Sequence, residues 1–276
     1  MTALSENAHE TADPIGSTVL RDLTDGVLTI TLNRPEAANA IRADQRDALI
    51  SLFTQADGDP DVRVVVLAAN GRHFCSGADV GGIGGGGEKR VGDPMRKIMG
   101  GAQRLVTSIL DCGKPVIASV QGVAAGMGAH LAYAADLVVA SDQASFIESF
   151  VLRGLVVDAG GAYLLPRRIG LQKAKELAFF GDRLPAAEAL ALGLVNRVVP
   201  ADQLAATTAE FAGRLATAPT SAIALTKRLF NTSLDGSREA ALLDEGMAQE
   251  IQSYAHDSGE GVAAFKERRS PEYRGW

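Results

Sequence analysis

Three segments of this 276-residue chain concentrate glycine, and two of them directly follow apolar runs of strand length. Gly122, Gly126 and Gly128 come after the run 116–120 and open a predicted helix. Backbone amides at such a point, together with the positive end of the helix dipole, stabilise an anion. The spacing Gly-x-x-x-Gly-x-Gly differs from the dinucleotide fingerprint Gly-x-Gly-x-x-Gly. The segment therefore favours anion stabilisation or close helix packing over dinucleotide binding.

The other two glycine-bearing segments lie close together in the sequence. Residues 74–79 read Phe-Cys-Ser-Gly-Ala-Asp and also end a buried apolar run. The glycine run 81–87 resembles a phosphate-binding loop in composition only, because it lacks the Gly-Lys-Ser/Thr ending. We interpret this run as a flexible surface loop that can serve as a lid over a cleft.

The elements that must position these segments alternate along the chain. β-Branched and apolar runs predict strands at residues 27–32, 64–69, 116–120 and 137–140. Helical spacing predicts helices at 43–55 and at 95–110. A third helix is predicted to follow the segment with Gly122, Gly126 and Gly128 and to run through residue 135. Such alternation indicates an α/β fold in which strand ends and helix starts supply sites.

The chain divides into three parts by composition. We expect a flexible tail over residues 1–17, a core with the active site over 18–200, and a helical oligomerisation region over 201–276. No Gly/Ser linker precedes the last part, so its helices should pack on the core or on a neighbouring subunit. The predicted C-terminal helices are 201–218, 221–233, 237–254 and 260–268.

Composition and charge exclude several classes of protein. Hydrophobic residues make up 46% of the chain and charged residues 22%, which is typical of a globular enzyme. The formal net charge of -6 is modest and the basic residues are scattered, so nucleic acid is not expected as a partner. Cys75 and Cys112 lack metal-ligand spacing and cannot form a disulfide framework. With no signal-peptide pattern and no segment of membrane-spanning length, we expect a cytoplasmic protein without a metal site or a membrane partner.

Two long motifs carry a specific resemblance to a known family. Residues 71–79, GRHFCSGAD, and residues 114–128, KPVIASVQGVAAGMG, are similar to the two oxyanion motifs of the enoyl-CoA hydratase/isomerase (crotonase) family. The resemblance extends over residues 18–270 and implies an acyl-CoA substrate. It also implies an α/β fold with a crotonase-like ββα spiral core and a C-terminal helical layer, assembled as a homotrimer or hexamer. Shorter matches stand at residues 32–35, 39–40, 135–136, 160–161, 165–167, 193–195 and 198–200.

The resemblance also implies how the site acts. The main-chain amides of Ala78 and Met127 would form an oxyanion hole for the thioester oxygen, which gains negative charge as the substrate reacts. Met127 stands where the family commonly has glycine, so its side chain would line the acyl pocket while its amide is kept. No cofactor is implied, because coenzyme A is part of the substrate.

Coenzyme A would be held mainly by main-chain contacts from the loop 34–39 and from the turn at residues 78–79. The resemblance places two further residues on the last helix, in positions that often reach coenzyme A from a neighbouring subunit. For Arg268 a solvated helix position is the alternative. The residues assigned to coenzyme A in this way are Arg34, Ala37, Asn39, Ala78, Asp79, Phe265 and Arg268.

The acyl end of the site departs from the hydratase pattern. Hydratases of this family hold water with two glutamates, and the matching positions here are His130 and Phe150. Each such acid or base contributes roughly 10²–10⁴-fold to the rate, so ordinary hydration is not expected. Glu148 lies two residues from the second position, and a shift of register would place it there. We expect Phe150, Glu148 and Met127 to line the acyl pocket.

Asp158 is the remaining acid near the expected acyl group. Isomerases of the family, including the 1,2-epoxyphenylacetyl-CoA isomerase type, often carry an aspartate here together with an apolar residue at the position of Phe150. One carboxylate suffices to move a proton between the α and γ carbons of an enoyl thioester through a dienolate. We therefore expect an enoyl-CoA isomerase with Asp158 as the proton shuttle. His130 is the second candidate catalytic residue, although a lone histidine is often structural.

Other functions stay open at this point. Hydration would need Glu148, and hydrolysis of a carbon-carbon bond would need water activated by His130 and Asp158. A catalytically weak acyl-CoA-binding protein would keep the oxyanion hole without turnover, and a nucleotide-dependent oxidoreductase would use the glycines after residue 121.

Overall fold

The computed structural model describes residues 17–79, 81 and 90–276. The predicted tail over residues 1–17 lies outside this range except for Ser17. The glycine run 81–87 also lies outside it except for Gly81, and with it the interpretation as a lid.

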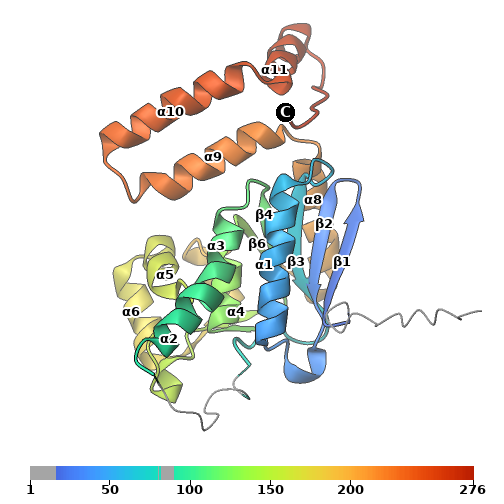
Figure 1. Ribbon diagram of the computed structural model, residues 1–276. Helices are drawn as coiled ribbons and strands as arrows, with labels where there is room; N and C mark the ends of the chain where they lie inside the picture. The colour runs from blue at the N-terminus through green and yellow to red at the C-terminus, as the bar shows by residue number, and fades with distance from the viewer. Residues whose placement is uncertain (1–16, 80, 82–89) are drawn as a thin grey trace, which may run out of the picture.

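A six-stranded sheet forms the centre of the molecule, in the order β1-β2-β3-β4-β6-β9 (Figure 1). β1 and β2 are antiparallel, and the other neighbouring strands are parallel. The four predicted strands are confirmed as β2, β3, β4 and β6. The strands of this sheet are β1 (Val19–Thr24), β2 (Val27–Leu32), β3 (Val64–Ala69), β4 (Val116–Val120), β6 (Leu137–Ser141) and β9 (Arg197–Val199).

The edge strands β1 and β9 were not predicted. In β1, three of the six residues are polar or charged, and β9 has only three residues. Asp25 and Gly26 connect β1 to β2 with positive φ angles of 50° and 78°. A two-residue loop of this kind is a type I′ hairpin turn, for which Asp-Gly is a favoured sequence. The Asp-Gly pair is therefore the signal in the sequence that indicates β1.

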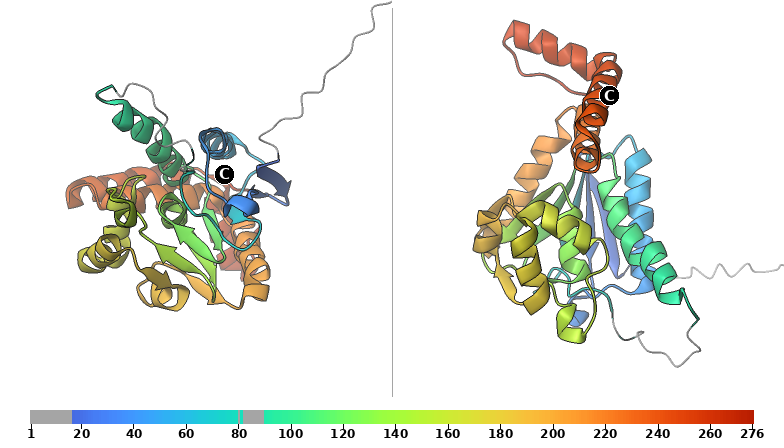
Figure 2. Two further views of the ribbon diagram at one scale, coloured as in Figure 1. Left: turned by 90° about the horizontal axis from the view of Figure 1, so that it is seen from below. Right: turned by 90° about the vertical axis from the view of Figure 1, so that its left-hand side faces the viewer.

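Helices cover both faces of this sheet. In β3, Val65 and Leu67 belong to a large hydrophobic cluster on one face, and Val64 and Val66 to a smaller cluster on the other. Figure 2 shows the sheet edge-on between α8 on one side and α1 with α3 on the other. Burial on both faces explains why the parallel strands read as continuous apolar runs. The helices packed on the sheet are α1 (Ala43–Gly58), α3 (Arg104–Leu110), α4 (Met127–Ala134) and α8 (Leu204–Ala216).

The segment that contains Gly122, Gly126 and Gly128 leads from the main sheet into a smaller one and then into α4. Three short strands, β5 (Val123–Ala125), β7 (Ser145–Ile147) and β8 (Arg183–Pro185), form this smaller sheet. All eight residues of α4 are buried, as expected of a helix that is apolar on almost every side. A Cβ on Gly128 would lie 2.3 Å from the carbonyl oxygen of Cys75, so only glycine permits the observed packing.

The remaining helical segments connect these layers. The predicted helix 95–110 is present, but its middle part is a π-helix that contains Gly100 and Gly101. These segments are η1 (Pro35–Ala37), α2 (Asp93–Lys97), η3 (Ile98–Gln103), η4 (Val151–Arg153), α5 (Gly161–Ile169), α6 (Leu171–Phe180), α7 (Ala186–Ala191) and η5 (Ala201–Gln203).

The C-terminal helices α9 (Thr220–Ser233), α10 (Arg238–Ser253) and α11 (His256–Glu267) confirm the expected helical region, although α11 begins four residues before its predicted start. They extend beyond one end of the sheet (Figure 1), and α10 has no buried residue. Lys227 ties α9 to the core through the Asp136 carboxylate at 2.8 Å. Within the described residues, no helix combines the length and the apolar character needed to cross a bilayer.

Gly128→Ala should lower the midpoint temperature of thermal unfolding, because the added methyl group would overlap the Cys75 carbonyl. Overpacking of this kind costs about 1–3 kcal/mol. The matched control is Gly213→Ala in α8, where nothing lies within 4 Å of the added atom. Because alanine is the better helix former, this control should be neutral or stabilising by up to about 1 kcal/mol. Equal midpoints for the two variants would contradict the close packing.

Candidate active site

The two glycine motifs meet at the N-terminus of α4. The Ala125 amide donates a hydrogen bond to the Cys75 carbonyl at 2.9 Å. Gly77 has a φ of 106°, and a Cβ there would lie 3.0 Å from the Ala125 carbonyl oxygen and 3.7 Å from the Met127 nitrogen. The structure thus brings the segment that carries Ala78 against the segment that carries Met127.

The amides of Ala78 and Met127 have no acceptor among the residues that the structure describes. Met127 is the first residue of α4, where free amides carry the positive end of the helix dipole. The backbone on both sides of Ala78 is fixed, because Ile41 donates to the Gly77 carbonyl and accepts from the Asp79 amide, each at 2.9 Å. Two unpaired amides on adjoining, fixed segments can stabilise a thioester oxyanion.

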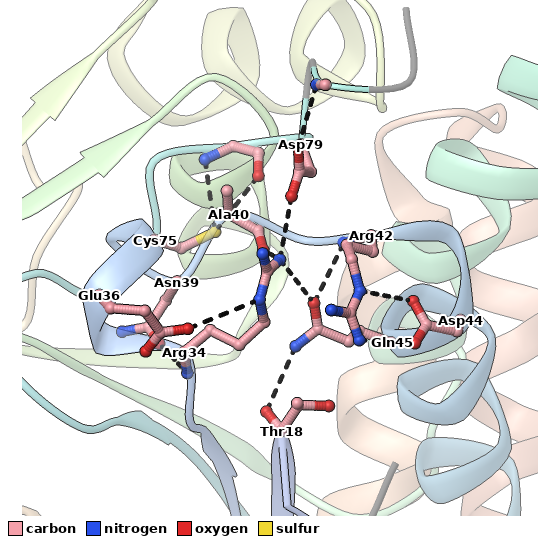
Figure 3. A network of polar contacts seen from close by, with 12 residues as sticks. Thr18, Arg34, Glu36, Asn39, Ala40, Arg42, Asp44, Gln45, Cys75 and Asp79 are labelled. Atoms are coloured by element: carbon pink, nitrogen blue, oxygen red, sulfur yellow. Dashed lines mark hydrogen bonds and ion pairs between the residues drawn. The ribbon is translucent and has the colours of Figure 1, made fainter. Parts of the chain in front are cut away.

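A polar network holds the segment of Ala78 in place (Figure 3). The Arg34 guanidinium donates to the Asp79 carboxylate at 3.0 Å, to the Gln45 side chain at 3.2 Å and to the Ala40 carbonyl at 2.8 Å. Asp79 also accepts the Gly81 amide at 3.0 Å, and this bond together with Arg34 holds the pKa of the Asp79 carboxyl below its ordinary value. The side chain of Arg34 is therefore directed into the protein.

Asn39 shapes the loop that follows β2. Its side chain is 2% exposed, accepts the Arg34 amide at 2.8 Å, and donates to the Asn70 and His73 carbonyls at 2.9 and 2.8 Å. Asn39 itself has a φ of 53°. What this loop, with the partly exposed Ala37 in η1, offers to a ligand is therefore mainly its main chain.

At the acyl end, the structure pairs two residues that the sequence leaves apart. His130 Nε2 lies 3.0 Å from Glu148 Oε2, and their side chains are 0% and 1% exposed. The imidazole stacks on the Phe150 ring with centroids 5.4 Å apart. Glu148 therefore serves as the partner of a buried imidazole.

Asp158 lies just before α5 and is partly exposed. Burial raises the pKa of its carboxyl above the ordinary value, and His130 opposes this rise. A carboxyl group with a raised pKa at the edge of a buried polar cluster is suited to accept and return a proton.

Phe265 and Arg268 lie apart from the other predicted residues. Phe265 is 86% exposed, and Arg268 ends α11 with a φ of 56°. Figure 1 shows α11 beyond the opposite end of the sheet from the N-terminus of α4. Within one chain, the structure does not bring these two residues to the site of Ala78.

Comparison with known proteins decides the family. The sequence profile described as enoyl-CoA hydratase/isomerase matches residues 22–275. The chain belongs to this family. It is 36% identical over 258 residues to a probable enoyl-CoA hydratase of Rhodobacter capsulatus, covering 94% of this chain and 98% of the relative. It is 35% identical over 257 residues to the 1,2-epoxyphenylacetyl-CoA isomerase of Escherichia coli, covering 93% and 98%.

Solved structures of the enoyl-CoA hydratase/isomerase family share the fold. An enoyl-CoA hydratase from Mycobacterium smegmatis superposes with a TM-score of 0.87 at 33% identity, over 93% of this chain and 98% of that chain. The expected crotonase-like α/β fold is thereby confirmed, and the protein is an acyl-CoA enzyme of the enoyl-CoA hydratase/isomerase family. A probable hydratase and an isomerase are almost equally similar in sequence to this chain. The comparisons therefore show the family but do not distinguish between the two reactions.

The pair of His130 and Glu148 is the feature of this family member that the sequence analysis missed. One signal was available, because Glu148 lies two residues after Phe146 and so shares the buried side of β7 and its extension. A carboxylate in that position needs a buried partner. Nothing in the sequence names residue 130 as that partner.

Arg34→Met should destabilise the fold by about 1–3 kcal/mol, because the buried acceptors around the guanidinium would lose their donor. The matched control is Arg42→Met in the same network. Arg42 is 42% exposed at its side chain and pairs with the exposed Asp44, so its loss should cost about 0–1 kcal/mol. Urea unfolding of both variants measures the difference, and comparable losses would show that Arg34 does not hold this loop.

Proposed function

We propose that the protein is an enoyl-CoA isomerase that shifts a double bond along the acyl chain. Asp158 removes a proton from the α-carbon of a 3-enoyl thioester and returns it to the γ-carbon. The amides of Ala78 and Met127 stabilise the dienolate oxygen between the two steps. Substrate and product have the same mass, and coenzyme A takes part only as the thioester, with no further cofactor.

The observation that carries this proposal is the placement of two carboxyl groups, those of Glu148 and Asp158, and of the His130 imidazole at the acyl end. Glu148 and His130 are buried against each other, whereas Asp158 is partly exposed and has a raised pKa. One free carboxyl group satisfies the requirement of a proton shuttle. The likeness to the 1,2-epoxyphenylacetyl-CoA isomerase of Escherichia coli supports the same class of reaction.

Hydration is the second candidate, because a relative at 36% identity is named a probable enoyl-CoA hydratase. Glu148 would have to leave His130 and reach a water molecule at the β-carbon. Carbon-carbon bond hydrolysis would similarly require His130, whose side chain is 0% exposed, to contact water. If no substrate turns over, the protein would instead be an acyl-CoA-binding protein with weak catalysis.

We also propose that the protein acts as a homotrimer or hexamer in the cytoplasm. The C-terminal helices carry many large exposed apolar side chains, and clusters of exposed apolar residues are typical of interaction sites. In an assembly, Phe265 and Arg268 of one subunit can approach the coenzyme A of another. The exposed apolar residues include Phe230, Leu242, Leu243, Met247, Ile251, Tyr254 and Phe265.

Incubation of the protein with a 3-enoyl-CoA should yield the 2-enoyl-CoA at unchanged mass. Asp158→Asn should lower kcat by about 10²–10⁴-fold, because amides do not accept a proton at neutral pH. Mass spectrometry and kinetics measure both, with the exposed Asp202→Asn as the matched control that keeps full activity. Addition of water to a 2-enoyl-CoA at a normal rate, lost in Glu148→Gln and kept in Asp158→Asn, would instead establish a hydratase.

The rate of isomerisation should fall on the acid side of its pH profile. Asp158 must be ionised to remove a proton, so kcat/KM is constant above its pKa and is lost as pH falls through it. Because burial raises that pKa, the acid limb should lie above the ordinary aspartate value of about 3.9. A limb at or below that value, measured in buffers of constant ionic strength, would count against Asp158 as the base.

A further inference from the structure

The His130 and Glu148 side chains form a closed polar unit inside the protein. His130 comes from α4 and Glu148 from the segment after β7, so the bond joins two layers of the fold. The rings of Phe150 and Tyr133 lie 5.4 and 5.9 Å from the imidazole centroid. Burial mainly, and the Glu148 carboxylate in addition, raise the pKa of the Tyr133 hydroxyl well above its ordinary value.

A buried carboxylate is stable only with a partner that donates to it. His130 Nε2 lies 3.0 Å from Glu148 Oε2, and this bond requires a proton on Nε2. The Tyr133 hydroxyl interacts with the same carboxylate. Nδ1 of His130 and Oε1 of Glu148 are buried without a hydrogen-bond partner in the described part of the chain. The single bond between the two side chains therefore fixes the orientation of the ring.

The edge of this ring rests against the turn that carries Asp158. A Cβ on Gly161 would lie 2.2 Å from Cε1 and 2.3 Å from Nε2 of His130, so the main chain at Gly161 is in direct contact with the imidazole. The Gly161 amide donates to the Asp158 carbonyl at 2.9 Å and closes the turn 158–161. Movement of the ring would therefore move the turn.

The turn 158–161 needs such support because its backbone is strained. Ala159 and Gly160 have φ angles of 45° and 78°, in the left-handed region. Ala159 is also fully buried, and a residue with a Cβ holds this conformation only where its surroundings enforce it. Val106 of α3 packs on the other side at Gly160 and supplies apolar contact alone.

His130 also acts electrostatically on Asp158. Among the described residues, His130 is the ionisable group that shifts the pKa of Asp158, and it lowers it. The other ionisable groups packed around the imidazole are Glu148, which is its hydrogen-bond partner, and Tyr133, which stays neutral. The imidazole that Glu148 holds in place therefore favours the ionised form of Asp158.

We propose that the buried His130–Glu148 pair positions Asp158 for proton transfer, with Glu148 fixing the imidazole and the imidazole supporting the turn 158–161. The inference rests on the proposed isomerase function. His130 and Glu148 are then positioning residues, which act through Asp158 without contacting the substrate. Neither one serves as the water-activating group of a hydratase or a hydrolase.

The test compares Glu148→Gln, His130→Gln and the double variant with the wild type on a 3-enoyl-CoA that the wild type isomerises. His130→Gln should move the acid limb of kcat/KM to higher pH, because Asp158 loses the interaction with His130 that lowers its pKa. The plateau value of kcat should fall by about 10–100-fold as the turn relaxes, with KM changed less. The double variant should match the single ones, because both act through the same ring.

Lys227→Met is the matched control, since it breaks another buried ion pair, at α9, and should lower the unfolding temperature without moving the limb. Two results would overturn the inference. One is an unmoved limb in His130→Gln. The other is loss of all turnover in His130→Gln while Glu148→Gln keeps the wild-type rate and limb, which would make His130 a direct catalyst.

A measurement on the wild type keeps the inference testable if the variants do not fold. Nitrogen-15 NMR of the histidine rings should show a slowly exchanging Nε2 proton on His130 across neutral pH, and its absence would falsify the proposed bond. Full turnover by Asp158→Asn is a different outcome, because it would reject the isomerase mechanism itself.

Discussion

Direct contact between two backbone segments is the constraint on which this site depends. Gly77 and Gly128 have no side chain. The loop after β3 and the start of α4 therefore pack against each other without a layer of side chains between them. The unpaired amides of Ala78 and Met127 lie on these two adjoining segments. Because main-chain atoms supply the donors, methionine at position 127 is compatible with an oxyanion hole.

Strained backbone surrounds this contact and is held by neighbouring side chains. Ala38, Asn39 and Ala159 have positive φ angles, which cost of order 1 kcal/mol or more each and persist where the surroundings enforce them. Asn39 holds its own loop through three hydrogen bonds. The ring of His130 lies against the turn that contains Ala159. Rigid support on both sides of the site is what preorganised catalysis requires.

Three buried or partly buried polar pairs each hold a different part of the molecule. Arg34 and Asp79 hold the expected coenzyme A side, His130 and Glu148 the acyl side, and Lys227 with Asp136 the first C-terminal helix. Each pair joins segments that are distant in the sequence. Such pairs add less to stability than equally large apolar contacts, but breaking one leaves an uncompensated buried charge. Their contribution is therefore to a defined arrangement of the segments they join.

The strands β2, β3, β4 and β6, the helical C-terminal region and the two motifs that identify the family could all be predicted from the amino-acid sequence. The strands and helices depend on local apolar runs, and the two motifs are identified by the local order of their residues, although Gly77 and Gly128 contact each other's segments. β1 was not predicted, because an exposed edge strand has little apolar pattern. The signal for it in the sequence is the Asp25-Gly26 turn.

Which polar side chains are free to react became clear only from the packing of distant segments. Glu148 and His130 are separated by 18 positions and by two strands, and their pairing depends on how β7 packs beside α4. The exposure of Asp158 depends on the same packing. A sequence pattern records the local period of burial, whereas the partner of a buried charge is set by contacts between distant segments.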